Sequence, residues 1–429
     1  MKTMLQGAAL LLSMGLSPLL AQAQEITVED NAPNSVVYIS TDKAGDEIIR
    51  IINETQSPRF HDPSAPRFLL TDRKGTFALG IGGYVKGVAE YDFNGISDNI
   101  DFYPSQIPTN GQTYARNQFQ MDVTTSTVFL KLVGRTKLLG DIVVYTAGNF
   151  RGSGKAFELR NAYASFLGFT VGYDYGSFMD LAAIPPSIDF AGPSGMTIYH
   201  AAQIRYEHSF LNKKMKFGVG VEMPSVDGLT NEFTTINVQR MPDIPIYLQY
   251  GWNSQSHIRL GGIIRNMTYN NLKSQKAVSE AGWGAQLSTT FNLGKKFVVY
   301  GQGTYGRGIA QFMNDISMLN VDLVPISGRE GEMEVLPMMG WYAGLQYNIC
   351  PNLFVSSSYS QSRLYGKDGY PCCQTMDQYR KGNYLVANIF WNVSKNLQIG
   401  AEYIRGWRTD FNDQQRTANR VNASAQYSF

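Results

Sequence analysis

The chain has 429 residues, a formal charge of +2 and a hydrophobic fraction of 43%. After the N-terminus it has no apolar run of about 18 residues, the length that a membrane-spanning helix needs, so a helical membrane protein is excluded. The chain is instead rich in aromatic residues and glycine, with 25 Tyr, 23 Phe and 42 Gly. This composition is typical of many strands joined by tight turns.

The first 23 residues have the pattern of a secretory signal peptide. Lys2 supplies a positive charge, residues 8–20 are apolar, and Ala21-Gln22-Ala23 is a small-x-small cleavage site. We therefore predict that residues 1–23 form a signal peptide. The alternative is an uncleaved anchor, which the short apolar run and the cleavage site make the weaker interpretation.

Residues 24–75 lack the alternation of a barrel strand, and we predict a periplasmic N-terminal segment there. Residues 36–40 and 47–52 could form two short strands, although the second could equally be a helical turn. Three prolines between residues 58 and 66 then break any regular structure.

From residue 76 onward, apolar and polar residues alternate, as they do on a strand that faces two different environments. In the first such stretch, Phe77 and Val85 share one face, whereas Lys86 and Glu90 share the other. We predict sixteen strands, with ends placed to within a few residues. They span residues 76–93, 115–132, 139–150, 157–167, 169–178, 197–209, 214–223, 245–252, 257–269, 281–292, 297–308, 338–349, 353–363, 381–393, 397–409 and 417–429.

The connections between these strands alternate in length. The long ones are residues 94–114, 179–196, 224–244, 309–337 and 364–380. The short ones are residues 168, 210–213, 293–296, 351–352 and 394–396. Short turns at one end and long loops at the other are typical of outer-membrane barrels. The sequence therefore predicts an all-β fold, a transmembrane antiparallel β-barrel of about 16 strands over residues 76–429, with short periplasmic turns and long extracellular loops.

The last strand ends on aromatic residues. Tyr427 and Phe429 share the apolar face with Val421, and small polar residues occupy the opposite face. An apolar face toward lipid, a polar face toward a wet interior and aromatics at the interface are typical of a closing barrel strand. A terminal Phe also resembles the signal by which outer-membrane proteins reach their insertion machinery, which we therefore expect as a partner through Phe429.

Several motifs, taken in their order along the chain, resemble one known family. They are Gly83-Tyr84-Val85-Lys86, Asn149-Phe150-Arg151-Gly152-Ser153-Gly154, FELRNAY at residues 157–163, VGYDYGSFMD at residues 171–180 and Ile188-Asp189-Phe190-Ala191-Gly192-Pro193. This ordered set resembles the DcaP-like trimeric porins, which are loosely related to the phosphate-selective porins. The resemblance covers residues 80–250 well and the C-terminal half only by pattern. It implies a homotrimer in the outer membrane of a Gram-negative bacterium.

The chain departs from the pattern of these porins at several places. Glu158 and Asn161 stand where the family has arginine and histidine, and residues 172–176 read Gly-Tyr-Asp-Tyr-Gly in place of GQTWS. The N-terminal region also has no heptad repeat of the kind that a coiled coil needs. These departures bear on the anion preference and on trimerisation through an N-terminal helix.

Charged and amide side chains on the inward-facing set of each strand are the predicted pore-lining residues. A charge on the lipid face would cost a few kcal/mol near the bilayer midplane, and rings of charged side chains set the selectivity of a channel. The alternative role for each residue is to brace the barrel wall through salt bridges. The predicted selectivity residues are Lys86, Glu90, Arg116, Asp122, Glu158, Arg160, Arg205, Glu207, Arg259 and Arg265, with Gln118, Gln120, Lys214, Lys216 and Glu222 on the same face.

The loop at residues 179–196 is apolar and rich in proline. It follows the fifth predicted strand, the place where general porins fold a loop into the lumen as a constriction. We expect Asp180, Pro185, Pro186 and Asp189 to belong to this constriction. The alternative is a loop that packs on neighbouring loops or subunits. Residues 309–337 are long enough to contribute as well.

No residues are predicted to be catalytic, to bind a cofactor or to hold a metal. Residues 301–306 match GxGxxG, but a dinucleotide site needs a strand that opens into a helix there. The four histidines lack metal-ligand spacing. Cys350 should be periplasmic and Cys372–Cys373 extracellular, and the membrane band of about 25 Å is far longer than the reach of a disulfide. The adjacent pair could form a vicinal disulfide, stay reduced or be modified.

Taken together, these patterns predict an outer-membrane porin. The expected function is passive diffusion of small hydrophilic solutes, with anions such as dicarboxylates favoured, and no catalysis. The expected partners are the outer-membrane lipid bilayer, small-molecule solutes and further copies of the chain, without nucleic acid. Two alternatives are a surface or adhesion protein whose barrel is only an anchor with a plugged lumen, and an outer-membrane hydrolase.

Overall fold

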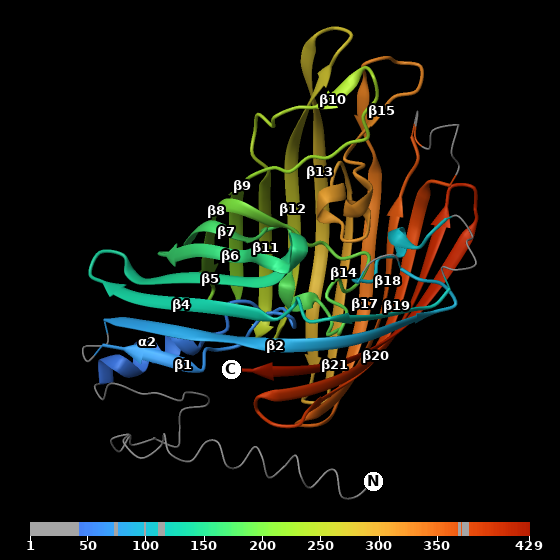
Figure 1. The fold of residues 1–429 in the computed structure, drawn as a ribbon. Coiled ribbons are helices and arrows are strands. Elements are labelled where there is room, and N and C mark those ends of the chain that lie inside the picture. Colours follow the sequence, from blue (N-terminus) through green and yellow to red (C-terminus); the bar gives the residue numbers. More distant parts are fainter. Residues whose placement is uncertain (1–42, 73–75, 98–99, 110–115, 368–369, 371–376) are drawn as a thin grey trace, which may run out of the picture.

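The computed structural model describes residues 43–72, 76–97, 100–109, 116–367, 370 and 377–429, and its main feature is a closed antiparallel barrel of 16 strands (Figure 1). The predicted signal peptide and the Cys372–Cys373 pair lie outside the described residues. Among the residues that are described, no helix is long and apolar enough to cross a membrane. The predicted fold class is confirmed.

Each wall strand pairs with its neighbours in sequence. The strands are β2 (Phe77–Phe93), β3 (Gln118–Asp122) continued by β4 (Thr127–Thr136), β5 (Gly140–Gly152), β6 (Ala156–Phe166), β7 (Phe169–Tyr175), β8 (His200–Phe210), β9 (Met215–Glu222), β11 (Ile244–Asn253), β12 (Ser256–Asn271), β13 (Lys276–Leu293), β14 (Phe297–Arg307), β17 (Pro337–Cys350), β18 (Leu353–Leu364), β19 (Tyr379–Asn392), β20 (Leu397–Asp410) and β21 (Gln415–Ser428). The barrel closes between β2 and β21, in a register that runs from Tyr84↔Ser428 to Phe93↔Asn419.

The remaining elements are short. They are α2 (Lys43–Asn53), β1 (Phe68–Thr71), β10 (Thr234–Ile236), β15 (Leu323–Pro325) and β16 (Met333–Val335), with 3-10 helices η1 (Pro104–Gln106), η2 (Ser153–Lys155), η3 (Leu181–Ala183), η4 (Ala310–Phe312) and η5 (Ile316–Leu319).

The connections sort by length as predicted. At one end, the turns are residues 137–139, 167–168, 211–214, 254–255, 294–296, 351–352 and 393–396. At the other end are the long loops, residues 94–117, 176–199, 223–243, 308–336 and 365–378, together with three short connections, residues 153–155, 272–275 and 411–414. Both ends of the barrel chain, the start of β2 and the end of β21, lie at the end with the short turns.

The larger differences from the predicted bounds lie in the second predicted strand and in the hairpin of β12 and β13. The second predicted strand is interrupted between Asp122 and Thr127, because the Asp122 carboxylate accepts a hydrogen bond from the backbone N–H of Thr124 at 2.9 Å and forms a local turn. The hairpin of β12 and β13 is longer than predicted, since its pairing continues to Asn271↔Lys276 (Figure 1).

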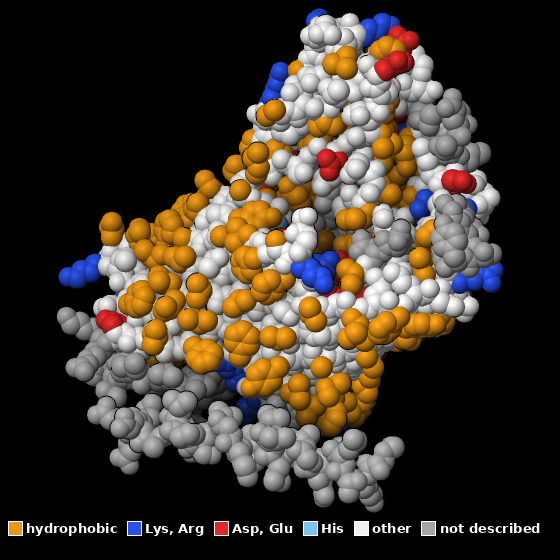
Figure 2. Space-filling view, viewed as in Figure 1, with side chains coloured by type: hydrophobic (Ala, Val, Ile, Leu, Met, Phe, Trp, Pro, Cys, Tyr) orange, Lys and Arg blue, Asp and Glu red, His pale blue; other side chains and the backbone are white. Residues whose placement is uncertain are grey.

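The outer wall is apolar, as the alternation predicts. Val85, Leu260 and Trp283 are exposed on it, and hydrophobic side chains spread over the outside of the barrel in Figure 2. On the alternate positions of β2, the side chains of Lys86 and Glu90 are buried inside the barrel. This division places lipid outside and polar groups inside.

The N-terminal segment packs against the barrel. Residues 47–52 belong to helix α2, so the helical alternative holds and the strand is wrong. Ile48 and Ile52 are buried against the start of β2 and against β4. After the helix, β1 pairs with β2, and Phe68 lies opposite Ile81. Figure 1 shows α2 and β1 beside β2.

Candidate functional site in the barrel lumen

The loop formed by residues 176–199 crosses the barrel interior. It leaves β7 and returns to β8, yet most of its residues are buried and they contact the opposite wall. Pro185 packs where Gly344 of β17 lacks a side chain, since a Cβ built at Gly344 would lie 3.1 Å from the Pro185 Cβ. The backbone carbonyl of Pro186 accepts a hydrogen bond from Asn388 on β19 at 2.9 Å. We call residues 176–199 the crossing loop.

A carboxylate on the far wall holds the tip of the crossing loop. Glu402 on β20 accepts hydrogen bonds from the backbone N–H groups of Ile188 at 2.7 Å and Asp189 at 2.9 Å. The Asp189 carboxylate in turn accepts hydrogen bonds from the Phe102 N–H and the Tyr384 hydroxyl, at 3.1 and 3.0 Å. Burial, together with the Asp101 and Glu402 carboxylates, raises the pKa of Asp189 to about 7.

The other predicted acid of the crossing loop has a different environment. The Asp180 carboxylate lies 2.8 Å from His257 Nε2 and accepts a hydrogen bond from the Ser288 hydroxyl at 2.6 Å. Burial alone would raise its pKa, but the hydrogen bond from His257 and the positive charge of Arg259 outweigh burial and lower the pKa below its usual value. Asp180 is therefore a fixed negative charge on the wall of β12 and β13.

Three guanidinium groups surround one aromatic ring of the crossing loop. The Cζ atoms of Arg59, Arg151 and Arg160 lie 4.9, 4.9 and 5.2 Å from the centroid of the Phe190 ring. Such distances are within the range of cation–π contacts. Arg59 also donates hydrogen bonds to the Tyr175 hydroxyl at 3.1 Å and to the Phe190 carbonyl at 2.8 Å. We call these three residues the arginine cluster.

The arginine cluster keeps donors that are not used by the protein. Within the described part of the chain, Arg59 Nε and Arg151 Nη1 are buried and have no hydrogen-bond acceptor. The nearby acids are Asp101, which forms an ion pair with Arg151, and Asp62, which accepts a hydrogen bond from the Tyr175 hydroxyl at 2.9 Å. Buried unused N–H groups are costly, and an anion could satisfy them.

A second set of charges lines a cavity of about 330 Å³ beside the crossing loop. Arg205 lies 3.2 Å from Asp174 and 3.7 Å from Glu207, while the Arg259 guanidinium stacks 3.5 Å from the Tyr247 ring centroid. The structure thus brings together the predicted residues Arg205, Glu207 and Arg259, with Asp180 in the same lining.

Two further cavities adjoin this one. A cavity of about 370 Å³ at the short-turn end is lined by Lys213, Lys214 and Lys216, and no acidic side chain contributes to its lining. A cavity of about 490 Å³ is lined by uncharged side chains such as Phe60 and Tyr300. Cationic groups therefore follow one side of the lumen, from the lysines at the mouth to Arg259 and Arg205, and the carboxylates of Asp174, Asp180 and Glu207 accompany the two arginines.

Four predicted pore residues brace the barrel instead of lining these cavities. Lys86 donates a hydrogen bond to the Ile188 carbonyl at 3.0 Å, and Glu90 lies 3.1 Å from Arg420. Asp122 caps the break after β3, as described above. Arg265 is fully buried between Asp243 and Asp322, at 3.1 Å from each. These contacts correspond to the wall-bracing alternative.

The last two predicted pore residues lie near the long-loop end. Arg116 is exposed next to the start of β3, and Glu158 is half-buried on β6. Neither lines the three luminal cavities.

Two members of the arginine cluster were not among the predicted site residues. Arg59 belongs to the N-terminal segment, which has no strand pattern, and Arg151 lies near the end of β5. Arg151 stands in the motif Asn149–Gly154 that carried the family resemblance, so a signal existed for it. For Arg59 the only signal was a basic residue next to Pro58 and Phe60.

The described residues give no sign of a metal or nucleotide site. No three of their His, Cys, Asp or Glu side chains gather as a metal site would require. Residues 301–306 lie inside strand β14, which is followed by the three-residue 3-10 helix η4 and not by an α-helix that starts within the motif. Cys350 is an exposed free cysteine at the end with the short turns.

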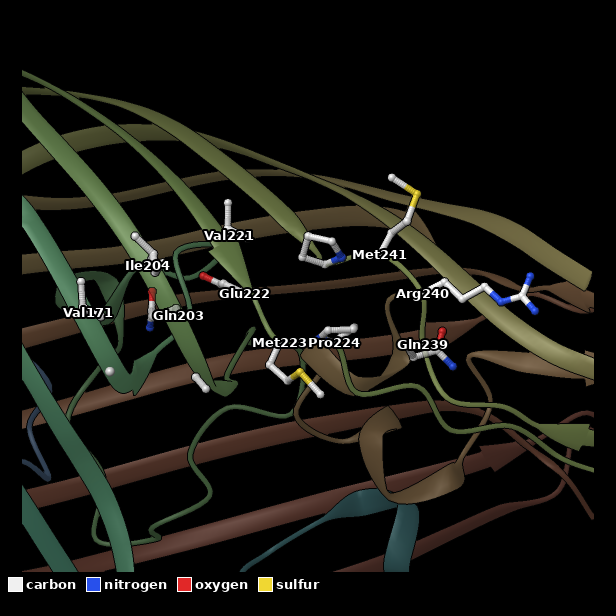
Figure 3. Close-up of a pocket in the computed structure, with 13 residues that line it drawn as sticks. Val171, Gln203, Ile204, Val221, Glu222, Met223, Pro224, Gln239, Arg240 and Met241 are labelled. Carbon is white, nitrogen blue, oxygen red and sulfur yellow. The ribbon is translucent and has the colours of Figure 1, made fainter. Parts of the chain in front are cut away.

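An apolar groove of about 550 Å³ lies on the outer surface (Figure 3). Its lining includes the exposed side chains of Ile204, Val221, Met223 and Met241, with Arg240 at one edge. Glu222 also belongs to the lining, and its carboxylate accepts a hydrogen bond from the Ser177 N–H.

Comparison with known families identifies the chain. The model of the DcaP outer membrane protein family matches residues 78–429. The chain belongs to the DcaP outer membrane protein family. This match extends the resemblance over the C-terminal half, and it confirms the predicted bacterial outer-membrane location and porin-type barrel. No curated protein sequence matches this DcaP-family chain.

Solved structures share the fold of this DcaP-family protein. The outer membrane channel DcaP of Acinetobacter baumannii is 19% identical, with a TM-score of 0.72, and the match covers 84% of this chain and 99% of that chain. The anion-selective porin from Comamonas acidovorans is 12% identical, with a TM-score of 0.54 and coverage of 82% and 100%. Salmonella typhi OmpF is 13% identical, with a TM-score of 0.51 and coverage of 84% and 100%.

Proposed function

We propose that this DcaP-family protein is a passive diffusion channel for small hydrophilic anions, with small dicarboxylates as the favoured class. Solutes would cross the outer membrane down their concentration gradient, through the lumen beside the crossing loop. The protein would supply charge and shape and no chemical step. Asp180, Pro185, Pro186 and Asp189 would then belong to the constriction.

The observation that carries this proposal is the row of cations along one side of the lumen. Lys213, Lys214 and Lys216 lie at the short-turn mouth without an acidic neighbour in the cavity lining, and Arg205 and Arg259 line the next cavity together with Asp174, Asp180 and Glu207. Much of the acidic charge on the opposite wall is already engaged, since Glu402 binds the crossing loop and Glu90 and Asp92 pair with Arg420. The electric field of cationic side chains along one side of the lumen favours anions and orients those that carry two carboxylates.

Two comparisons support the same proposal. The protein from Acinetobacter baumannii is described as an outer membrane channel, and the porin from Comamonas acidovorans as anion-selective. We also propose a homotrimer, because OmpT of Vibrio cholerae, a porin-fold neighbour with a TM-score of 0.51, has a trimer form. The N-terminal segment, α2 and β1 would lie on the periplasmic side, next to the short turns. Barrel-insertion machinery would recognise Phe429.

A closed barrel that serves as an anchor is the second candidate. It is favoured by one specific observation: two segments, the crossing loop and residues 54–62, both run through the lumen. A barrel of 16 strands otherwise leaves an aqueous lumen. The two candidates differ in one measurable property, which is the conductance of the inserted protein.

A hydrolase is the least supported candidate. His257, Asp180 and Ser288 do meet in the lumen, but the Ser288 hydroxyl donates its hydrogen bond to the Asp180 carboxylate. His257 contacts the same carboxylate oxygen. In a catalytic triad the histidine must instead lie between the serine and the acid and accept the serine proton. This arrangement holds Asp180 ionised and does not activate the serine.

The test is single-channel conductance of the purified protein in planar bilayers, with the reversal potential measured under a salt gradient. We expect three-step closing and a reversal potential that favours anions. Arg205→Ala and Arg160→Ala should weaken that preference, whereas Arg116→Ala, which removes an exposed charge away from the cavities, should not. Cation selectivity would overturn the anion assignment, and the absence of any conductance would overturn the open channel.

A further inference from the structure

We infer that residues 54–62 of the N-terminal segment are a fixed part of the solute path, and that Arg59 is a selectivity-determining residue. We call residues 54–62 the luminal segment. The inference that Arg59 favours anions rests on the proposed function. The inference that the luminal segment limits the width of the path does not, because it concerns geometry alone.

The luminal segment reaches both sides of the barrel. On one side, Gln56 donates a hydrogen bond to the Tyr163 hydroxyl of β6 at 3.1 Å. On the other side, the Phe60 ring packs against Phe390 of β19 and Phe354 of β18, with centroid separations of 4.8 and 6.3 Å. These contacts place the segment across the lumen and in a defined position.

The middle of the luminal segment is joined to the crossing loop. His61 Nε2 lies 3.0 Å from the Asp189 carbonyl oxygen, and the Tyr84 hydroxyl of β2 donates a hydrogen bond to the His61 carbonyl at 2.6 Å. Arg59 donates to the Phe190 carbonyl, as described above. The two segments therefore form one unit, and the opening that remains is bounded by both of them.

Both ends of the luminal segment are anchored to the wall. At its start, the Lys131 ammonium on β4 donates hydrogen bonds to the carbonyl groups of Ile51 and Glu54, at 2.6 and 2.8 Å. This places a cation at the C-terminal end of α2, where the helix dipole favours it. After it, β1 pairs with β2. A short stretch of chain fixed at both ends has little freedom to leave the lumen.

The luminal segment also divides the luminal cavities. Pro58 lines the charged cavity of about 330 Å³ and the uncharged cavity of about 490 Å³. Gln56 and Ser57 contribute to the first and Phe60 to the second. Removing these side chains would widen both spaces, which also share Ala182, Ser254 and His257 in their linings, so the segment limits the cross-section that a solute can use.

Arg59 gives the luminal segment a chemical role in addition to its bulk. Its side chain is buried, and its guanidinium is one of the three that surround the Phe190 ring. Arg151 is paired with Asp101, whereas Arg59 bonds to the neutral Tyr175 hydroxyl and a carbonyl. Arg59 therefore places a guanidinium at the point where the luminal segment meets the crossing loop, and the nearest acid of its own segment, Asp62, contacts the same Tyr175 hydroxyl.

The experiment compares full-length variants in planar bilayers. Arg59→Gln removes the charge with little change in size, and Arg50→Gln, on the exposed face of α2, is the matched control. We expect Arg59→Gln to lower the anion-to-cation permeability ratio at least about fivefold, because one unit charge at about 4 Å changes the occupancy of a single ion by about that factor even in water and acts in opposite directions on anions and cations. Arg50→Gln should leave the ratio unchanged. An unchanged ratio in Arg59→Gln would overturn its role in selectivity.

A second variant tests the width. Replacing residues 56–60 with a Gly-Ser linker of equal length removes the side chains that divide the cavities, and the single-channel conductance should rise. An unchanged conductance would overturn the geometric inference. A wild-type protein that is cation-selective or does not conduct would instead overturn the proposed function. If the linker variant of such a protein conducts more than the wild type, the luminal segment is still the element that limits the path.

Discussion

The carboxylate of Glu402 on β20 accepts a hydrogen bond from the backbone N–H of Ile188 at 2.7 Å. Ile188 lies at the tip of the crossing loop, which starts from β7 and crosses the barrel interior to reach Glu402. The same carboxylate accepts bonds from the Asp189 N–H and the Ser187 hydroxyl. Glu402 thus binds three donors at the tip of the crossing loop, two of them backbone N–H groups, while Asn388, Tyr384 and Lys86 donate further hydrogen bonds to the same tip.

We predict that Glu402→Ala releases the tip of the crossing loop. Each hydrogen bond to a charged group contributes about 1.5–3 kcal/mol, and the donors left behind would be buried without acceptors. The single-channel conductance should become larger and noisier, and thermal unfolding in detergent should shift to lower temperature. Glu402→Gln is the control, because it keeps the size and one acceptor oxygen and should lie between the wild type and the alanine variant. If the Glu402→Ala conductance has the same size and the same low noise as that of the wild type, the anchoring role of Glu402 is contradicted.

We predict that anion selectivity depends on pH through Asp189. Its pKa is raised to about 7 by burial and by the Asp101 and Glu402 carboxylates, so the carboxyl is charged above that pH and neutral below it. As the pH falls through about 7, the lumen loses one negative charge and the preference for anions should increase. The reversal potential under a salt gradient at a series of pH values measures this.

The control for this titration is Asp189→Asn, which removes the charge at every pH and keeps the shape. At every pH, Asp189→Asn should show the anion selectivity that the wild type shows at acidic pH, and the change in selectivity near pH 7 should be absent. His61 does not explain such a step, because burial and the charges of Lys86 and Arg59 hold its pKa well below the usual value and keep the ring neutral. A step of the same size in Asp189→Asn would assign the titration to another group.

The barrel itself could be predicted from the sequence because the alternation that marks each strand depends only on neighbouring residues in the chain. A strand between lipid and water must alternate, and the pairs Val85 and Lys86, or Ile399 and Gly400, show this without any knowledge of the partner strands. The sorting of short turns and long loops then gives the topology. The break after Asp122 was missed because it depends on a side-chain cap and not on alternation.

The interior was much less predictable, because an inward-facing charge has two possible partners. Arg205 and Arg265 look alike in the sequence, yet Arg205 lines a cavity whereas Arg265 is covered by the loops that carry Asp243 and Asp322. That difference is set by loops that fold back from distant parts of the chain. Arg59 was missed for the same reason, since no strand pattern marks a segment that enters the lumen from outside the barrel.

We predict that Arg265→Met destabilises the protein strongly. Arg265 is fully buried and donates hydrogen bonds to Asp243 and Asp322, so the substitution leaves two carboxylates without their partner. Breaking a buried pair in this way costs about 3–5 kcal/mol. Thermal unfolding in detergent measures the loss, and the long loops that meet at Arg265 should become sensitive to protease.

The comparison for Arg265→Met is an exposed ion pair in the same half of the barrel. Lys273 pairs with Glu330, and both side chains are more than half exposed. Exposed pairs contribute about 0–1 kcal/mol, so Lys273→Met should have little effect on unfolding. Equal losses of thermal stability from the two substitutions would mean that burial does not set the strength of the ion pairs that Arg265 forms with Asp243 and Asp322.

We predict that Cys350 lies on the periplasmic side, because it is exposed at the end of the barrel that carries the short turns. In a variant in which Cys372 and Cys373 are replaced by Ser, Cys350 is the only cysteine of the chain. A maleimide attached to a polymer too large for the lumen should fail to label it in intact cells and should label it after the outer membrane is permeabilised. Lys273→Cys in a chain without other cysteines is the control, since Lys273 is exposed near the β12–β13 turn and should be labelled in intact cells. The reverse labelling pattern would invert the topology, placing the long loops in the periplasm and the lysine-lined mouth at the cell surface.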